Sequence, residues 1–177
     1  TGADLLTREL PDVKSVYHRM NRQDKYKVTI SPEMISKAFT SYDKLESFIK
    51  QRRKNFDLLK EGLKDLEDKL ILPIKEKNST PSWFGFLITC KEGISRNHIT
   101  KYLEEHNIQT RTLFAGNIIK HPCFDSIRDD NTSYRVVGSL ENTEKVMNDT
   151  FWIGVYPGMK KEEIEYMIEI IKESLSN

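Results

Sequence analysis

Between residues 43 and 175 the sequence alternates between helical and strand periods, and this alternation restricts the possible folds more than any other feature. Residues 43–68 carry apolar side chains mostly three or four positions apart with charged side chains between them, which predicts a long amphipathic helix. Residues 82–90, SWFGFLITC, alternate instead. Phe84, Phe86, Ile88 and Cys90 are expected on one side of this strand. Since the opposite side is also largely apolar, we expect an inner strand.

The remaining segments continue the alternation. Ser95 is a suitable N-cap for the next helix, and Pro157 and Gly158 close the last strand. In chain order, the expected elements after residue 95 are a helix, a strand at 107–114, a long loop at 115–141, a helix at 142–150, a strand at 151–158 and a helix at 160–175. This order predicts an α/β or α+β fold, with helices packed on a small mixed or antiparallel sheet.

The expected loop is unusually apolar where it begins. Its first part, FAGNIIKHPCF at 114–124, contains Phe114, Ile118 and Ile119. We expect these side chains to lie outside the main core, with the isolated chain either self-associating or showing this loop disordered, because large exposed apolar patches are uncommon on monomers. The alternative is that the loop folds back and buries them.

The first 40 residues differ from the rest of the chain. They are strongly charged, weakly periodic and interrupted by Pro11 and Pro32, with YKVTI at 26–30 as their only good strand candidate. We therefore divide the chain into a divergent N-terminal arm at 1–40 and one domain at 41–177.

Composition excludes some classes of function. Charged residues make up 31% of the chain but balance to a net charge of +1, which does not favour nucleic acid or an anionic membrane as a partner. No apolar run could span a bilayer, and the first residues lack a leader pattern, so we expect a cytoplasmic protein. Cys90 and Cys123 have no paired spacing, which favours free thiols over a disulfide or a metal site.

Motif spacing alone identifies no chemistry. The four histidines are scattered, and His98 and His106, eight residues apart on one predicted helix, are best interpreted as surface residues. The sequence contains no phosphate-binding glycine loop and no nucleophile elbow. We therefore assign no catalytic residue and no metal ligand.

Several longer stretches resemble one enzyme family. They are FIKQRRKNFDLLKEGL, PSWFGFLIT, GISRNHITKYLEEHNIQTRTLFAGN, YRVVGSLENTEKVMNDTFWIGVYPGM and the closing helix. From about Leu45 onward the chain resembles the C-terminal small domain of the DegT/StrS family of nucleotide-sugar enzymes, which depend on pyridoxal phosphate (PLP) or pyridoxamine phosphate (PMP). TRTLFAGN, YRVVG and NDTFWIGVYPG are most similar to the branch of CDP-4-keto-6-deoxyglucose 3-dehydrases.

This resemblance implies the C-terminal domain of a homodimeric 3-dehydrase of 3,6-dideoxyhexose and lipopolysaccharide O-antigen synthesis. No segment resembles the family's cofactor domain, so we expect this chain to bind no PMP or PLP and to be inactive alone. The family's N-x-K-x-T-D-x-Q-A-A motif is replaced here by KVTISPEMIS. The alternatives are a non-catalytic remnant or binding module for sugar nucleotides or partners, and a fragment of a sugar aminotransferase.

The resemblance also suggests substrate-binding residues. Arg111 and Arg135 are candidates for the nucleotide diphosphate, because a guanidinium matches phosphate oxygens bidentately; for both, a surface ion pair is the alternative. Phe114, Ala115, Gly116 and Asn117 would form a turn near the hexose. Aminotransferases of the family typically carry His at the position of Phe84, so Phe84 favours dehydration, unless it is simply a core aromatic.

Overall fold

The structure, a computed structural model, describes residues 42–130 and 132–176. The chain divides into two compact units, Thr1–Glu46 and Ser47–Asn177. The second unit contains every helix and strand named below, apart from the first two residues of helix α3. The strand expected at 26–30 and the replaced family motif lie outside the described residues.

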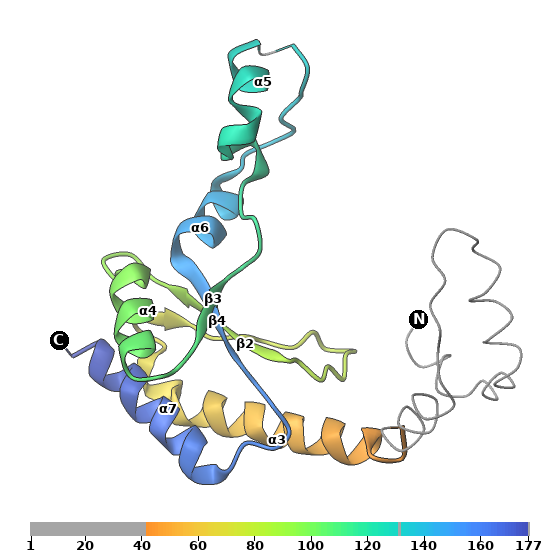
Figure 1. The fold of residues 1–177 in the computed structure, drawn as a ribbon, viewed down its shortest axis with the longest axis vertical. Helices are drawn as coiled ribbons and strands as arrows, with labels where there is room; N and C mark the ends of the chain where they lie inside the picture. The colour runs from red at the N-terminus through yellow and green to blue at the C-terminus, as the bar shows by residue number, and fades with distance from the viewer. Residues whose placement is uncertain (1–41, 131, 177) are drawn as a thin grey trace, which may run out of the picture. The chain divides into compact units, whose positions relative to one another are not determined.

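The centre of the second unit is a four-stranded antiparallel sheet in the order β1-β2-β4-β3 (Figure 1). Its strands are β1 (Leu70–Ile71), β2 (Gly85–Cys90), β3 (Thr110–Thr112) and β4 (Thr150–Gly154). The prediction that β2 is an inner strand is confirmed, because it pairs with β1 on one side and β4 on the other.

Helices α3 (Leu45–Gly62), α4 (Arg96–Glu105) and α7 (Lys161–Ser174) supply the helical part of the core. Phe86 and Ile88 of β2 and Phe151 and Ile153 of β4 are fully buried, and they form one cluster with residues of all three helices. The helical members of this core are Phe56, Leu59, Ile99, Leu103, Ile164, Met167, Ile170 and Ile171. The expected class of helices on a small antiparallel sheet is therefore confirmed.

The apolar stripe of α3 is buried only in its second half. Phe56 and Leu59 are in the core, whereas Leu45 and Phe48 are exposed. Arg53 of this helix is exposed but also donates hydrogen bonds to the carbonyls of Thr80 and Pro81. This side chain therefore holds the polar 75–81 loop to the helix.

The strand expected at 107–114 is much shorter in the structure because both ends turn away from the sheet. Helix α4 begins at the predicted Ser95 cap, whose hydroxyl accepts a hydrogen bond from the His98 amide. At its other end Asn107 has a left-handed φ of 61°, and the Ile108 amide donates to the Leu103 carbonyl. This helix-ending motif leaves only Thr110–Thr112 for β3.

The alternation expected across 82–90 is wrong at its beginning. Trp83 and Phe86 both pack against Phe56, with ring centroids 4.6 and 4.8 Å from it. The backbone bends at Phe84, which lies 62% exposed against Trp152 on the opposite side of the sheet. Phe84 is therefore neither on the side of Phe86 nor a core aromatic.

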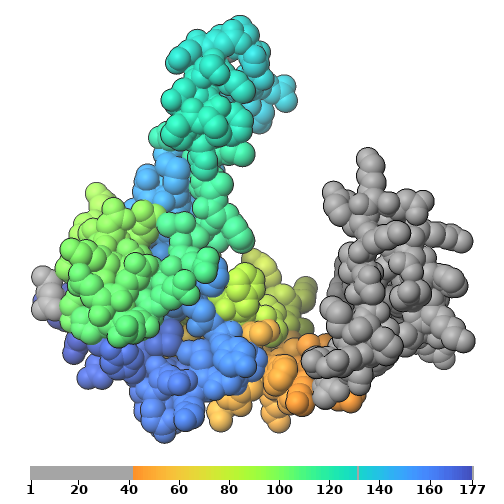
Figure 2. All heavy atoms as spheres, viewed as in Figure 1, coloured from red at the N-terminus to blue at the C-terminus, as the bar shows by residue number. Residues whose placement is uncertain are grey.

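Residues 113–140, which we call the β3–α6 segment, extend away from the sheet as a narrow projection (Figures 1 and 2). The prediction of a loop at 115–141 is wrong in detail, because the segment contains short helices whose lengths are too small to give a periodic pattern. They are η2 (Ile118–Lys120), η3 (Pro122–Phe124) and α5 (Asp125–Asp130), and helix α6 (Glu141–Asp149) follows.

The expected exposure of the apolar loop residues is confirmed. Phe114 is 81% exposed and Ile118 57% exposed, and Ile119 is half-buried outside the core cluster. The alternative in which the loop buries them within the same unit is therefore wrong. Among the described residues no helix has the length and apolar character needed to cross a bilayer.

Candidate functional site

Arg111 lies on the side of the sheet opposite the core helices. It is exposed and pairs across the ladder with Trp152, and the Trp152 ring meets the Phe84 ring edge to face at 5.3 Å. Residues opposite each other in an antiparallel pair project to the same face of the sheet. The structure thus places a guanidinium and two aromatic rings together, although Phe84 and Arg111 are 27 residues apart in the sequence.

A hollow of about 730 Å³ lies beside Arg111. Trp152 and Gly154 of β4 and Tyr166 of α7 contribute to its wall, together with Glu162 and Glu163 at the start of α7. Its lining contains no lysine that could bind the aldehyde of PLP. The negative charges of the two glutamates would repel a phosphate group. The residues around Arg111 therefore offer no lysine anchor for PLP, and their two carboxylates disfavour the phosphate that PLP and PMP share.

The turn after β3 has an uncommon backbone conformation. Phe114 has a φ of 49°, which is rare for a bulky residue, and its amide donates to the carbonyl of Thr112 two residues earlier. Gly116 also has a positive φ, of 63°, and a Cβ built there would lie 2.5 Å from Cγ of Met147. Gly116 is therefore required both by its backbone angle and by its contact with α6.

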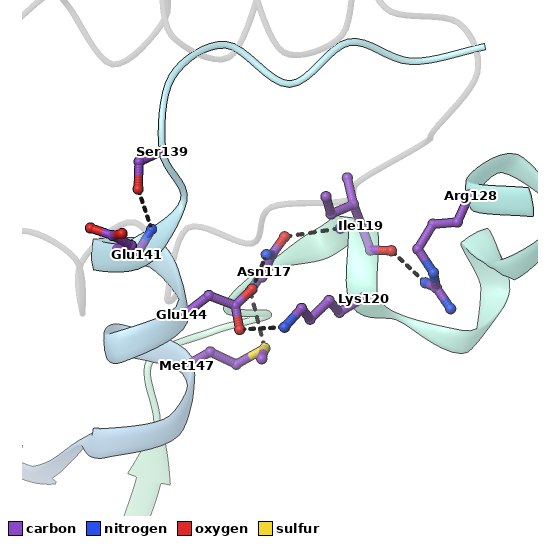
Figure 3. Close-up of polar contacts among 8 residues, drawn as sticks. All are labelled: Asn117, Ile119, Lys120, Arg128, Ser139, Glu141, Glu144 and Met147. Atoms are coloured by element: carbon purple, nitrogen blue, oxygen red, sulfur yellow. Dashed lines mark hydrogen bonds and ion pairs between the residues drawn. The ribbon is translucent and has the colours of Figure 1, made fainter. Parts of the chain in front are cut away.

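Asn117 is buried, with 3% of its surface exposed, and its polar atoms are used within the protein. Its Nδ2 donates to Glu144, its Oδ1 accepts a hydrogen bond from the Ile119 amide, and its own amide points at the sulfur of Met147 (Figure 3). Asn117 thus caps the short helix η2 and ties it to α6.

Arg135 lies elsewhere in the β3–α6 segment. It is exposed between α5 and α6, in the part of the segment that also exposes Val136 and Val137. The predicted site residues therefore fall into three places: the sheet face with Arg111 and Phe84, the turn from Phe114 to Asn117, and the outer segment with Arg135. Their roles in binding a substrate stay predictions.

Sequence reasoning missed three side chains that shape this region. Trp152 links the predicted residues Arg111 and Phe84, while Glu144 and Met147 of α6 hold the turn. The only usable sequence feature was the apolar, strand-like FWIG that begins at residue 151. Nothing in the helical pattern of 141–149 distinguishes Glu144 from the other acidic residues of α6.

The shifted pKa values of Glu144 and Cys90 have clear causes. The ammonium group of Lys120 and then the amide of Asn117 donate to Glu144 and lower the pKa of its carboxyl group. Burial raises the pKa of the Cys90 thiol to about 11, and Asp149 adds to this shift. Cys90 is thus an inert core thiol, whereas Cys123 is exposed.

His98 of α4 and His106 at its C-terminal end both pack on Tyr102. The rings of His98 and His106 stack on Tyr102 at 6.4 and 4.3 Å, and the Tyr102 hydroxyl donates to Glu173 of α7. In the described part of the chain no three His, Cys, Asp or Glu side chains gather where they could hold a metal ion.

Comparison with known sequences identifies the family. The model of the DegT/DnrJ/EryC1/StrS aminotransferase family matches residues 35–172, and the chain belongs to this family. The lipopolysaccharide biosynthesis protein RfbH of Salmonella typhimurium is 42% identical over 150 residues, which cover 84% of this chain and 33% of that protein. The dTDP-4-dehydro-2,6-dideoxy-D-glucose 3-dehydratase of Saccharopolyspora spinosa is 42% identical over 138 residues, 77% of this chain and 29% of that protein.

Solved structures agree with this assignment. An E. coli GDP-4-keto-6-deoxy-D-mannose-3-dehydratase with bound hydrated PLP superposes with a TM-score of 0.62 at 25% identity, over 75% of this chain and 33% of that one. The chain therefore spans about a third of the length of the relatives that it matches.

The beginning of the chain has a different likeness. The model of the Phi29-like phage major capsid protein family matches residues 1–57. The major capsid protein of Bacillus phage GA-1 is 39% identical over 46 residues, which are 26% of this chain and 10% of that protein. This likeness is consistent with the divergence seen in the first 40 residues, where the family motif is replaced.

Proposed function

We propose that residues 47–177 act as the C-terminal, substrate-facing domain of a nucleotide-sugar 3-dehydratase, and that this domain does not itself hold the cofactor. The observation that carries the proposal is the arrangement of Arg111 beside Trp152 and Phe84 on an exposed sheet face, directly before the Phe114 turn. It lies within the region matched by the family and by 3-dehydratases that are 42 and 25% identical.

The chemistry of this surface suits a nucleoside diphosphate linked to a hexose. The Arg111 guanidinium can donate two parallel hydrogen bonds to phosphate oxygens, and Trp152 and Phe84 offer aromatic surface beside it. Phe84 cannot carry a proton, whereas the histidine that typically occupies this position in the family's aminotransferases can. This difference favours a dehydratase over the aminotransferase alternative.

Several large apolar side chains of this unit are exposed, which favours a further protein surface that covers them. Phe84, Phe114, Ile118 and Val137 are between 57 and 81% exposed, which is unusual for so many large apolar residues in one small unit. We propose that they contact the part of the enzyme that corresponds to the other two thirds of the relatives, or a second subunit of a homodimer. A cytoplasmic location, with both thiols free, completes the proposal.

A titration of the 177-residue chain with dTDP tests the substrate part of the proposal. We expect weak binding, on the order of millimolar, because only part of the site is present. Amide NMR signals near Arg111 and Trp152 should shift, and Arg111→Ala should abolish these shifts. Lys101→Ala removes a positive charge from an exposed site on α4 and serves as the control. If both variants lost the dTDP-induced shifts equally, the binding would be a non-specific attraction between positive charge and phosphate.

A cofactor titration tests the other part of the proposal, that this domain does not itself hold the cofactor. Because the residues around Arg111 do not fit PLP or PMP, the purified chain should show no saturable change in the absorption bands of either cofactor. A stoichiometric, saturable spectrum would show that the chain itself holds the cofactor, and would overturn the division of roles proposed above.

The second candidate is a non-catalytic module that binds sugar nucleotides or a partner protein. The observation that favours it is the capsid-like sequence at 1–57, where the family's own motif is replaced. The first candidate and a sugar-nucleotide-binding module both predict dTDP binding at Arg111, whereas a module that binds only a partner protein does not. Only the first predicts that the domain supports dehydration when it is joined to the rest of a relative.

A further inference from the structure

The Phe114 turn combines exposure with an unfavourable backbone, so other contacts must hold it in place. Phe114 is 81% exposed and therefore gains little from packing, yet it occupies the left-handed region. Non-glycine residues in such conformations are retained when the surrounding structure determines them, and they concentrate at functional sites. Contacts with neighbouring elements must therefore fix this turn.

The main contacts come from one side chain of helix α6. The two carboxylate oxygens of Glu144 accept hydrogen bonds from different residues beyond the turn: Oε1 from Asn117 Nδ2 and Oε2 from Lys120 Nζ at 2.6 Å (Figure 3). Asn117 is buried, and only about a quarter of the Glu144 side chain is exposed. The bond to the buried Asn117 is therefore charge-assisted and shielded from water, whereas the Lys120 side chain is 54% exposed and its pair with Glu144 adds less.

A second contact joins the same two elements. Met147, three residues after Glu144, lies against the Cα of Gly116 and presents its sulfur to the Asn117 amide at 3.4 Å. Glu144 and Met147 thus face the turn from one side of α6 (Figure 3). Together they contact Gly116 and Asn117, which immediately follow Phe114 and Ala115, and Lys120 at the end of η2.

The outer part of the segment is fixed to the turn by its own hydrogen bonds. His121 donates through Nε2 to the Ala115 carbonyl, and Arg128 donates to the carbonyls of Ile119 and His121. Arg128 also pairs with Asp125. These bonds hold the short helices of the β3–α6 segment together, but they do not reach α6. Apart from the Ser139 hydroxyl, which accepts a hydrogen bond from the Glu141 amide where the chain enters α6, the described contacts that link the turn to α6 come from Glu144 and Met147.

We propose that Glu144 is the positioning residue of the candidate site: it holds Asn117 and Lys120 so that Phe114 stays in its exposed, left-handed conformation beside Arg111. The sequence-based role of Asn117 changes accordingly. Asn117 acts through Glu144 as a link within the protein, while Phe114 and Arg111 face the ligand. That the ligand is a nucleotide sugar rests on the proposed function; the positioning by Glu144 does not.

Amide hydrogen exchange on the full 177-residue chain tests the positioning. Losing charge-assisted bonds from a partly buried carboxylate should raise the local opening equilibrium at least about tenfold. We therefore expect Glu144→Ala to accelerate exchange of the Ile119 and Lys120 amides by that factor, while amides of β2 and β4 keep their rates. Glu144→Gln keeps an acceptor oxygen for Asn117 and should restore most of the protection. Glu141→Ala, in the first turn of the same helix, should leave the turn unchanged.

Two outcomes would overturn the proposal. The first is wild-type exchange at residues 114–121 in Glu144→Ala. The second is acceleration that is equal across the sheet, because Glu144 would then contribute only to general stability. A dTDP titration separates this proposal from the proposed function. If dTDP fails to bind the wild-type chain but Glu144→Ala still loosens the turn selectively, the positioning stands and the assigned ligand is wrong. If dTDP binds, Glu144→Ala should weaken the shifts at Phe114 more than those at Trp152.

Discussion

Asn55 connects helix α3 to the turn between β4 and α7, and its replacement should be among the most costly polar substitutions in the domain. The side chain is 1% exposed. Its Nδ2 donates to the Tyr156 carbonyl at 2.8 Å, across 101 residues of sequence, and its Oδ1 accepts a hydrogen bond from Gln51 at 2.9 Å. Asn55→Ala removes both bonds and leaves the Tyr156 carbonyl without this donor.

The expected magnitude follows from these contacts. A partner left unsatisfied in a buried position costs about 1–3 kcal/mol, so we expect Asn55→Ala to lower the free energy of unfolding by about 2 kcal/mol. For a unit of this size that corresponds to a decrease in Tm of roughly 6–10 °C. Gln51→Ala removes only the half-buried bond and should cost about 0.5–1 kcal/mol.

Urea unfolding followed by circular dichroism measures these changes, and Asn55→Asp identifies their cause. Aspartate has nearly the same shape and still accepts from Gln51, but near neutral pH it places a charged oxygen against the Tyr156 carbonyl. It should therefore destabilise the domain at least as much as alanine does. If Asn55→Asp were as stable as the wild type, the hydrogen bond to Tyr156 would not be what makes Asn55 important.

Three further predictions concern the β3–α6 segment and the thiols. Gly116→Ala should destabilise the domain by about 2–4 kcal/mol, because it combines a left-handed backbone with overlap against Met147; a loss below about 0.5 kcal/mol in urea unfolding would contradict the contact. The folded-state pKa of Glu144 lies below its ordinary 4.5, so its stabilisation should be complete above that pH and be lost as the pH falls through the lower value; unchanged exchange of residues 114–121 in acid would refute this. A thiol reagent should modify Cys123 quickly and Cys90 only on unfolding, whereas two fast thiols would contradict the burial of Cys90.

Much of the architecture could be predicted from periodic patterns, because those patterns record burial on one face. Helices α4, α6 and α7 and strands β2 and β4 lie within a few residues of their predicted bounds. The predictions failed where local backbone chemistry decided the outcome. Asn107 and Phe114 adopt positive φ angles that shorten β3, and the bend at Phe84 moves its ring to the other side of the sheet.

The candidate site was predictable only in part, for a related reason. The resemblance pointed to Arg111 and to the stretch from Phe114 to Asn117, and these residues do lie close together in sequence and fold. It could not show that Asn117 is buried against Glu144, since that contact joins segments 27 residues apart. A contact between distant segments leaves no periodic pattern in a single sequence, so Glu144, Met147 and Trp152 were not predicted.

A hybrid enzyme tests the central claim most directly. The 138-residue stretch of the Saccharopolyspora spinosa 3-dehydratase that matches this chain would be replaced by the corresponding residues of this chain, and turnover of the sugar nucleotide measured after folding and cofactor binding have been verified by circular dichroism and absorption. We predict that the hybrid catalyses dehydration, and that Arg111→Ala in it raises the Michaelis constant by about 10- to 100-fold, as expected for the loss of a charge-assisted bond to phosphate. A folded, cofactor-loaded hybrid without turnover, or one whose Michaelis constant is unaffected by Arg111→Ala, would contradict the assignment of this domain as the substrate-facing part of a 3-dehydratase.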